Sequence, residues 1–133
     1  MADNKAASWT RCVIHELEPL QHGMEIRLSE LERNLRSDEA YLRGDHTART
    51  LAHEPDLRVV LIAMKAGGRL EEHRAKATAS VQVLSGQIRV GLPDKVVKLS
   101  VGSFLLLDQG LQHSVEAETE SAFLLTLGAP GED

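Results

Sequence analysis

The sequence predicts an all-β domain, either a sandwich or a barrel. From about residue 47 onward, short apolar runs are separated by turn residues at regular intervals, which is the spacing of consecutive short strands. Polar and apolar side chains alternate within most of these runs, as in strands that bury one face. The turn signals are, in chain order, Glu54-Pro55-Asp56, Gly67-Gly68, Ser85-Gly86, Leu92-Pro93-Asp94, Val101-Gly102, Asp108-Gln109-Gly110 and Glu118-Thr119-Glu120.

These turns delimit the strands that we expect. The strands lie near residues 47 to 53, 57 to 65, 78 to 84, 86 to 91, 95 to 100, 103 to 107, 111 to 117 and 121 to 127. Two runs, Val59 to Met64 and Phe104 to Leu107, are apolar on consecutive residues, so both of their faces should be covered. A partner subunit is the simplest cover, and we therefore expect a homodimer.

The residues before the barrel are expected to form an extension that packs on it. We place the extension at residues 1–46 and the barrel at residues 47–129. The extension contains a predicted strand, Arg11 to Leu17, which is ended by Pro19. It also contains one short helix over residues 28–37, whose apolar residues at helical spacing are Leu28, Leu31 and Leu35.

The start of this helix has the pattern of a capping box. Ser29 and Glu32 stand three residues apart, so their side chains are expected to bond the free backbone N–H groups of the first turn. No other amphipathic helix is indicated. A DNA-reading helix-turn-helix needs two helices, so the pattern argues against that motif.

Composition and charge argue against nucleic-acid and membrane partners. Fifteen Lys and Arg stand against 20 Asp and Glu, the net charge is -5, and the arginines are scattered rather than gathered into a basic stripe. One Trp, one Tyr and two Phe are too few for a stacking platform. The longest apolar run, Leu57 to Met64, is far shorter than the ~20 residues of a membrane-spanning helix.

The beginning of the chain and its single cysteine indicate a cytoplasmic protein. Cys12 has no second cysteine for an intrachain disulfide, and residues 1–8 lack the charged and then apolar order of a signal peptide. With 133 residues, one domain is the most economical organisation.

A histidine lies on the apolar side of one predicted strand. In the stretch from Gly67 to Gly86, "GGRLEEHRAKATASVQVLSG", every second residue from His73 onward is small or apolar. These residues are Ala75, Ala77, Ala79, Val81 and Val83. His73 is thus expected to point inward, beside alanines that fill little space.

A second histidine repeats this pattern. His113 alternates with apolar residues in "LQHSVEA", where Leu111, Val115 and Ala117 share its side. Two hairpins separate the two strands, and this connection can bring His73 and His113 side by side. An apolar surround would keep both imidazoles mostly neutral at pH 7.

These residues resemble the cupin superfamily, in particular small single-domain conserved-barrel cupins of the cupin 2 type. The first cupin motif, G(X)5HXH(X)3-4E(X)6G, runs from Gly67 to Gly86 with His73 as its first histidine. The second, G(X)5PXG(X)2H(X)3N, starts at Gly102 and keeps Gly110 and His113. The resemblance implies a cupin double-stranded β-helix, a jelly-roll barrel, with a short N-terminal helix.

The two motifs are degenerate in this chain. Ala75 and Ala79 stand where cupins have the second histidine and the glutamate, and Asp108 and Ala117 replace the proline and the asparagine. Cupins with the full set generally hold a divalent metal with three histidines and the glutamate. The resemblance therefore implies a barrel without a catalytic metal cofactor.

Our principal interpretation is a cupin domain that binds a small organic molecule in the barrel, as a sensor or accessory protein. The expected ligand-binding residues are His73, His113, Ala75, Ala79 and Val81. Each neutral imidazole offers one donor and one acceptor to a carbonyl, a hydroxyl or a carboxylic acid.

Two alternatives stay open. One is a metal-dependent enzyme of the dioxygenase or isomerase type, which would use His73, His113 and either Glu71 or a ligand from the N-terminal segment. The other is a ligand-free interaction module, in which Leu and Phe side chains of the facing sheet fill the space beside the alanines. The remaining histidines match no ligand spacing; they are His15, His22, His46 and His53.

Overall fold

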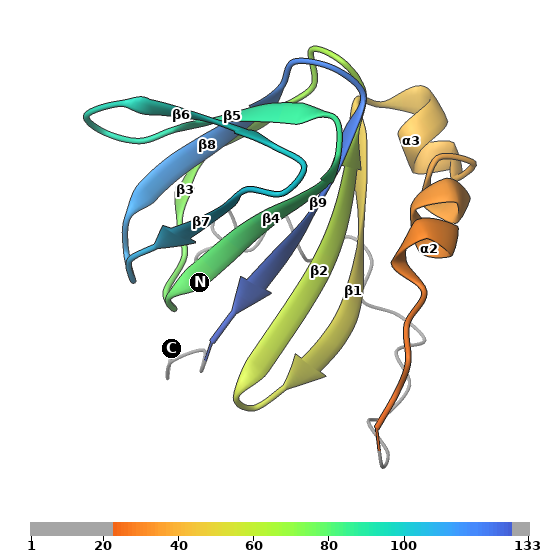
Figure 1. Ribbon diagram of the computed structural model, residues 1–133, viewed down its shortest axis with the longest axis horizontal. Coiled ribbons are helices and arrows are strands. Elements are labelled where there is room, and N and C mark those ends of the chain that lie inside the picture. Colours follow the sequence, from red (N-terminus) through yellow and green to blue (C-terminus); the bar gives the residue numbers. More distant parts are fainter. Residues whose placement is uncertain (1–22, 129–133) are drawn as a thin grey trace.

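The computed structural model describes residues 23–128, which form two antiparallel sheets with two short helices beside them (Figure 1). The helices are α2 (Leu28–Leu35) and α3 (Glu39–Arg43). The strands are β1 (His46–Glu54), β2 (Leu57–Met64), β3 (Arg69–Arg74), β4 (Ala79–Ser85), β5 (Gln87–Gly91), β6 (Val96–Ser100), β7 (Phe104–Leu107), β8 (Gln112–Ala117) and β9 (Ser121–Leu127). The all-β class is confirmed, and none of the described helices is long and apolar enough to cross a membrane.

The strands are wound from one sheet to the other along the chain. One sheet has the order β1-β2-β9-β4-β7, and the other has the order β3-β8-β5-β6. Apart from the β1–β2 and β5–β6 hairpins, each strand is followed by one in the opposite sheet. This is the winding of a jelly-roll barrel, and it brings residues far apart in the chain onto facing walls.

The predicted strands are confirmed, with ends that differ by one residue or so, but β3 was not among them. The alternation from His73 to Val83 is divided between β3 and β4, rather than forming one strand. Residues 75–78 carry the chain from the four-stranded to the five-stranded sheet, and burial still alternates through them. The strand predicted at Arg11 to Leu17 lies outside the described residues.

The predicted helix is confirmed, but its capping box is wrong. The N-cap residue is Arg27, and no side chain caps the helix there. Glu32 instead accepts hydrogen bonds from Ser85 Oγ at 2.7 Å and from Arg36 Nη2 at 2.8 Å. Its carboxylate thus ties α2 to the end of β4. The short helix α3, which follows, was not predicted from the sequence.

The two helices cover the outer face of β2. Leu61 and Ala63 are fully buried against Leu35 and Tyr41. The cover expected from a partner subunit at Val59 to Met64 is therefore supplied by the chain itself, because the amphipathic helices lie on that face.

The apolar run of β7 is covered on one face only. Leu107 is buried, whereas Phe104 and Leu106 are 58% and 63% exposed in the described structure. The expectation that both faces of Phe104 to Leu107 are covered is thus wrong for the described part of the chain. Alternate residues of an edge strand point away from the core, and no described helix lies over them.

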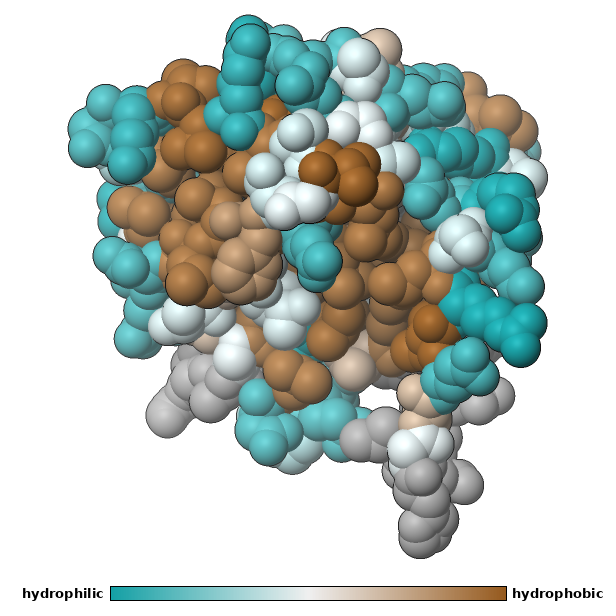
Figure 2. All heavy atoms as spheres, in the orientation of Figure 1, coloured by the Kyte–Doolittle hydropathy of each residue, from teal (hydrophilic) through white to brown (hydrophobic). Residues whose placement is uncertain are grey.

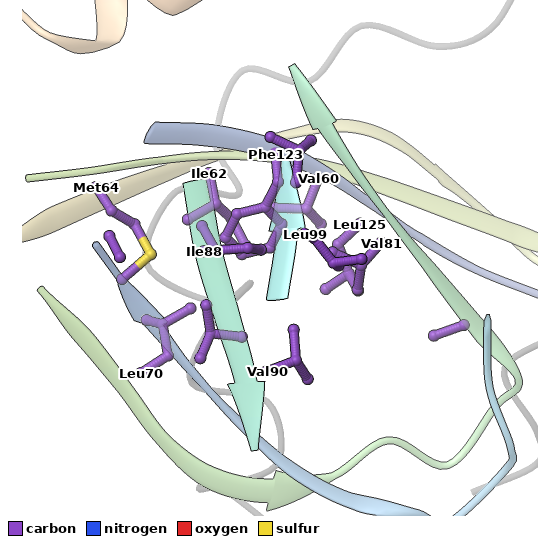
Figure 3. Close-up of a cluster of buried hydrophobic side chains, with 14 of the residues drawn as sticks. Val60, Ile62, Met64, Leu70, Val81, Ile88, Val90, Leu99, Phe123 and Leu125 are labelled. Carbon is purple, nitrogen blue, oxygen red and sulfur yellow. The ribbon is translucent and has the colours of Figure 1, made fainter. Parts of the chain in front are cut away.

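Large apolar side chains from both sheets fill the interior (Figure 3). The cluster includes Val60, Ile62, Met64, Leu70, Val81, Ile88, Val90, Leu99, Phe123 and Leu125. At its rim, Gly86 has a φ of 77° and joins β4 to β5. A Cβ at that position would collide with the Glu120 carbonyl oxygen and Ser121 Oγ, so only glycine permits this close turn.

Candidate functional site

The two inward histidines are brought into contact at one end of the barrel. His73 on β3 pairs directly with His113 on β8 in the antiparallel register. Their ring centroids are 4.6 Å apart and the rings are tilted by 55°. His73 is 9% exposed and His113 is 1% exposed, so both imidazoles are buried.

A β-bulge decides which residues accompany His73 on the inner wall. The β3–β8 register shifts between Leu70 and His73, and these two residues are both buried although they are three apart. Glu71 and Glu72 are consequently both exposed, on the outer side. Glu72 Oε1 accepts a hydrogen bond from Gln112 Nε2 at 2.8 Å there.

The bulge corrects the expectation that Glu71 could share the inner face with His73. The alternation predicted from the sequence fails at this point because the extra residue turns Glu71 outward. Within residues 23–128, no group of three or more His, Cys, Asp or Glu side chains is placed to hold a metal ion.

His113 is oriented by its own backbone. Its Nδ1 lies 3.0 Å from the carbonyl oxygen of Leu111. A carbonyl only accepts, so Nδ1 donates, and Nε2 of the neutral ring is left as an acceptor. Burial lowers the pKa of His113 below its ordinary value, and the bond to Leu111 partly offsets that effect. The lowered pKa agrees with the expected neutral imidazole.

The predicted small residues lie on more than one wall of this end. Ala75 follows His73 in the crossing segment, whereas Ala79 and Val81 lie on β4 of the facing sheet. Ala79 is 2% exposed and pairs with Leu107 and with Leu127. Both Ala79 and Val81 belong to the apolar core cluster, in which Val81 is labelled in Figure 3.

Backbone hydrogen bonds hold the crossing segment in place. The N–H of Gly110 donates to the carbonyl of Ala75 at 2.8 Å, and the N–H of Gly128 donates to the carbonyl of Thr78 at 3.0 Å. The segment is therefore tied to the β7–β8 turn, which precedes His113, and to the end of β9. These ties fix the alanines relative to the histidine pair.

Two polar residues at this end were not identified from the sequence. Thr50 on β1 pairs with Val60 and is 4% exposed. Arg58 on β2 occupies the same alternation as Val60, Ile62 and Met64, whose side chains form the core. Arg58 was overlooked because it lies within the apolar run that begins at Leu57. Its position two residues before Val60 was the signal that could have identified it.

Comparisons with known proteins support the fold. No family model matches the chain, and no curated protein matches it. A solved cupin superfamily protein from Desulfitobacterium hafniense superposes with a TM-score of 0.68 at 15% identity, covering 86% of this chain and 98% of that one. A conserved protein of unknown function from Streptococcus pyogenes also has a TM-score of 0.68, at 18% identity, over 90% of this chain and 98% of that one.

A third solved structure is more similar in sequence. The cupin 2 conserved barrel domain protein from Leptotrichia buccalis is 30% identical with a TM-score of 0.61, and the match covers 64% of this chain and 41% of that one. The glycines that frame both motifs in the present chain also share a positive φ, namely Gly67, Gly86, Gly102 and Gly110. The strand order, the motif glycines and these similarities together identify the fold as that of a small cupin of the cupin 2 type.

Proposed function

We propose that this chain binds a small organic molecule at the end of the barrel marked by His73 and His113, without a catalytic metal, as a sensor or accessory protein. The observation that carries the proposal is the imidazole pair, with centroids 4.6 Å apart, in an interior whose other side chains are mostly apolar. Ligand sites typically combine apolar walls with a few converging polar groups.

The cost of burying imidazoles supports a role in binding. Taking polar rings out of water is unfavourable unless hydrogen bonds compensate, and apolar side chains would fill the same space at lower cost. The bond to Leu111 holds His113 in one tautomer and fixes the orientation of its ring. Buried imidazoles of fixed orientation can take part in recognising a polar group of a ligand.

The metal-enzyme alternative has less support. Catalytic zinc sites use three protein ligands, and non-haem iron sites use two histidines and a carboxylate. Here Ala75 and Ala79 replace two of the family's ligands, and Glu71 points outward. We therefore propose that the barrel keeps the site of its metal-binding relatives in degenerate form.

The test is a thermal-shift screen of small alcohols, amides and acids, run on the parent, on His113→Leu and on His46→Gln as a control at a partly exposed histidine beside Met64, at the other end of the barrel. The proposal expects stabilising compounds that act on the parent and the control but not on His113→Leu. Parallel melts with chelator and with zinc, nickel, manganese or iron(II) test the alternative. If metal raises the melting temperature of the parent and chelator reverses this rise, the result would favour the metal-dependent enzyme.

We further propose that the protein is a homodimer and that β7 lies in the interface. Phe104 and Leu106 are exposed on this strand, and Figure 2 shows a hydrophobic area on the side of the molecule that carries β7 in Figure 1. Exposed apolar patches of this kind mark interaction sites.

The outer face of the four-stranded sheet is a poorer candidate for the dimer interface. Arg89 on β5 places its Nη2 3.2 Å from Glu116 Oε1 and its Nη1 3.5 Å from Glu118 Oε2. Lys98 Nζ lies 3.8 Å from Glu118 Oε2. Such charges are well solvated at a surface and costly to bury.

The dimer mass in light scattering should be lost in Leu106→Glu and kept in Val96→Glu, which places the same charge at an equally exposed position on β6. A monomeric parent would contradict the dimer.

A further inference from the structure

We propose that the bound molecule carries a carboxylate and that Arg58 binds it, an inference that rests on the proposed function. The proposal concerns the inward polar side chains at the histidine end of the barrel. It adds to the ligand a group that the histidine pair does not specify, because an ionised carboxylate has no proton to donate to an imidazole acceptor.

The topology places Arg58 at the same end of the barrel as the histidines. Leu70 packs in the same cluster as Met64 (Figure 3), and β3 runs from Leu70 toward His73. β2 ends at Met64 and begins beside Arg58, so the start of β2 and the end of β3 lie at one end. The hydrogen-bonded register agrees, because Arg58 pairs with Leu127, and Leu127 pairs with Ala79 at the end of the crossing segment.

The guanidinium of Arg58 has N–H donors that the described residues do not use. Among the described residues it contacts no carboxylate, and its Nη2 lies 3.2 Å from Nε2 of His53. Its Nε is buried and has no hydrogen-bond partner within residues 23–128. An unmade hydrogen bond at a buried charged donor is costly, so the arrangement favours an external acceptor.

No carboxylate is among the fully buried polar side chains of the described part, although the net charge of the whole protein is -5. Those side chains belong to Thr47, Thr50, His73, His113 and Ser121. Arg58 is partly buried, and no salt bridge joins it to a carboxylate within residues 23–128, so its charge can attract an anion. The flat guanidinium matches a carboxylate with two parallel hydrogen bonds.

The experiment compares probes that differ only in this group. Hexanoate and hexanamide, and benzoate and benzamide, are titrated by calorimetry into the parent, Arg58→Gln, Arg58→Lys and Arg33→Gln. Arg33 lies in the last turn of α2, away from the barrel interior, and serves as the matched control. Circular dichroism and a thermal melt of each variant establish that it is folded, and Arg58→Lys provides a charged variant if Arg58→Gln does not fold.

The expected result is that each carboxylate binds the parent at least about tenfold more tightly than its amide. Arg58→Gln should lose this preference while keeping its amide affinity, Arg58→Lys should keep part of it because a point charge replaces the fork, and Arg33→Gln should match the parent. Equal binding of acids and amides, or a preference that survives Arg58→Gln, would overturn the carboxylate inference and leave the binding function standing. Failure of all four probes to bind the parent at millimolar concentration would count against both.

Discussion

The two ends of the barrel interior are built from different side chains. At one end, Met64, Ile88 and Phe123 are large, apolar and at most 1% exposed. At the other, the rings of His73 and His113 are in contact, and the segment that follows His73 contains the small residues Ala75 and Ala77. A close-packed apolar end stabilises the fold, whereas the end with small and polar side chains contributes less burial. The large buried side chains at one end contribute most to stability, whereas the candidate site lies at the other end.

The largest effect is expected at the apolar end. Phe123 is fully buried between the sheets, so Phe123→Ala should lower the free energy of unfolding by about 3–5 kcal/mol through lost burial and a residual cavity. Urea unfolding monitored by circular dichroism measures this. A loss below about 1 kcal/mol would mean that the two ends do not differ as described.

A smaller effect is expected when a histidine and a glutamate are introduced at the two positions where the full cupin motif has metal ligands. The double variant Ala75→His with Ala79→Glu should be destabilised by about 3 kcal/mol without metal, because an uncompensated carboxylate is introduced where Ala79 is 2% exposed. Divalent metal at one hundred times its dissociation constant should restore about 2.7 kcal/mol, since it binds only the folded state.

Paired thermal melts with chelator and with nickel, manganese, iron(II) or zinc measure this recovery. The parent, run alongside, should show no metal-dependent rise. If the variant folds but does not respond to metal, Ala75 and Ala79 do not occupy vacated ligand positions.

Replacing the histidine pair should have a smaller effect on stability. In His73→Leu with His113→Leu, two apolar side chains of similar volume replace two buried imidazoles, but the Leu111 carbonyl loses its donor, so the free energy of unfolding should fall by about 1–2 kcal/mol. Denaturant unfolding of the double variant measures the change. A loss as large as that of Phe123→Ala would show that the pair is a structural element of the core.

The smallest effect is the dependence of stability on pH. Burial lowers the pKa of His113 in the folded state, so the unfolded chain binds this proton more tightly. The resulting stability should be complete above pH about 6.5 and should fall as the pH drops through that value, with a slope of at most about 1.4 kcal/mol per pH unit.

Urea unfolding across this pH range compares the parent with His113→Leu, which should lack this contribution to the slope. Identical slopes in the two proteins would show that His113 titrates as it does in the unfolded chain.

Much of this architecture was accessible from the sequence alone. Turn residues between short apolar runs predicted the strands, because the two faces of a strand differ at every second residue whatever lies beyond it. The same alternation predicted that His73 and His113 point inward, and the spacing of Leu28, Leu31 and Leu35 predicted α2. These are local patterns, which each segment carries within itself.

Other features depended on contacts between distant segments. The bulge that turns Glu71 outward arises from the pairing of β3 with β8, and the sequence of β3 contains no signal that predicts it. Residues 75–78 contain neither glycine nor proline, so the crossing that places Ala79 on the facing sheet resembles a continuing strand. Glu32 bonds Ser85 and Arg36 rather than capping α2, because the tertiary partners compete with the local one.

The cover of Leu61 and the position of Arg58 were likewise decided by the tertiary structure. The apolar run of β2 predicts that both faces of the strand are buried. Only the tertiary structure shows that α2 and α3, rather than a partner subunit, cover one of these faces. Arg58 becomes a candidate only when the register joins it to Leu127 and Ala79 at the end that holds the histidines. Alternation determines which way a side chain faces, and only the winding of the two sheets decides what it faces.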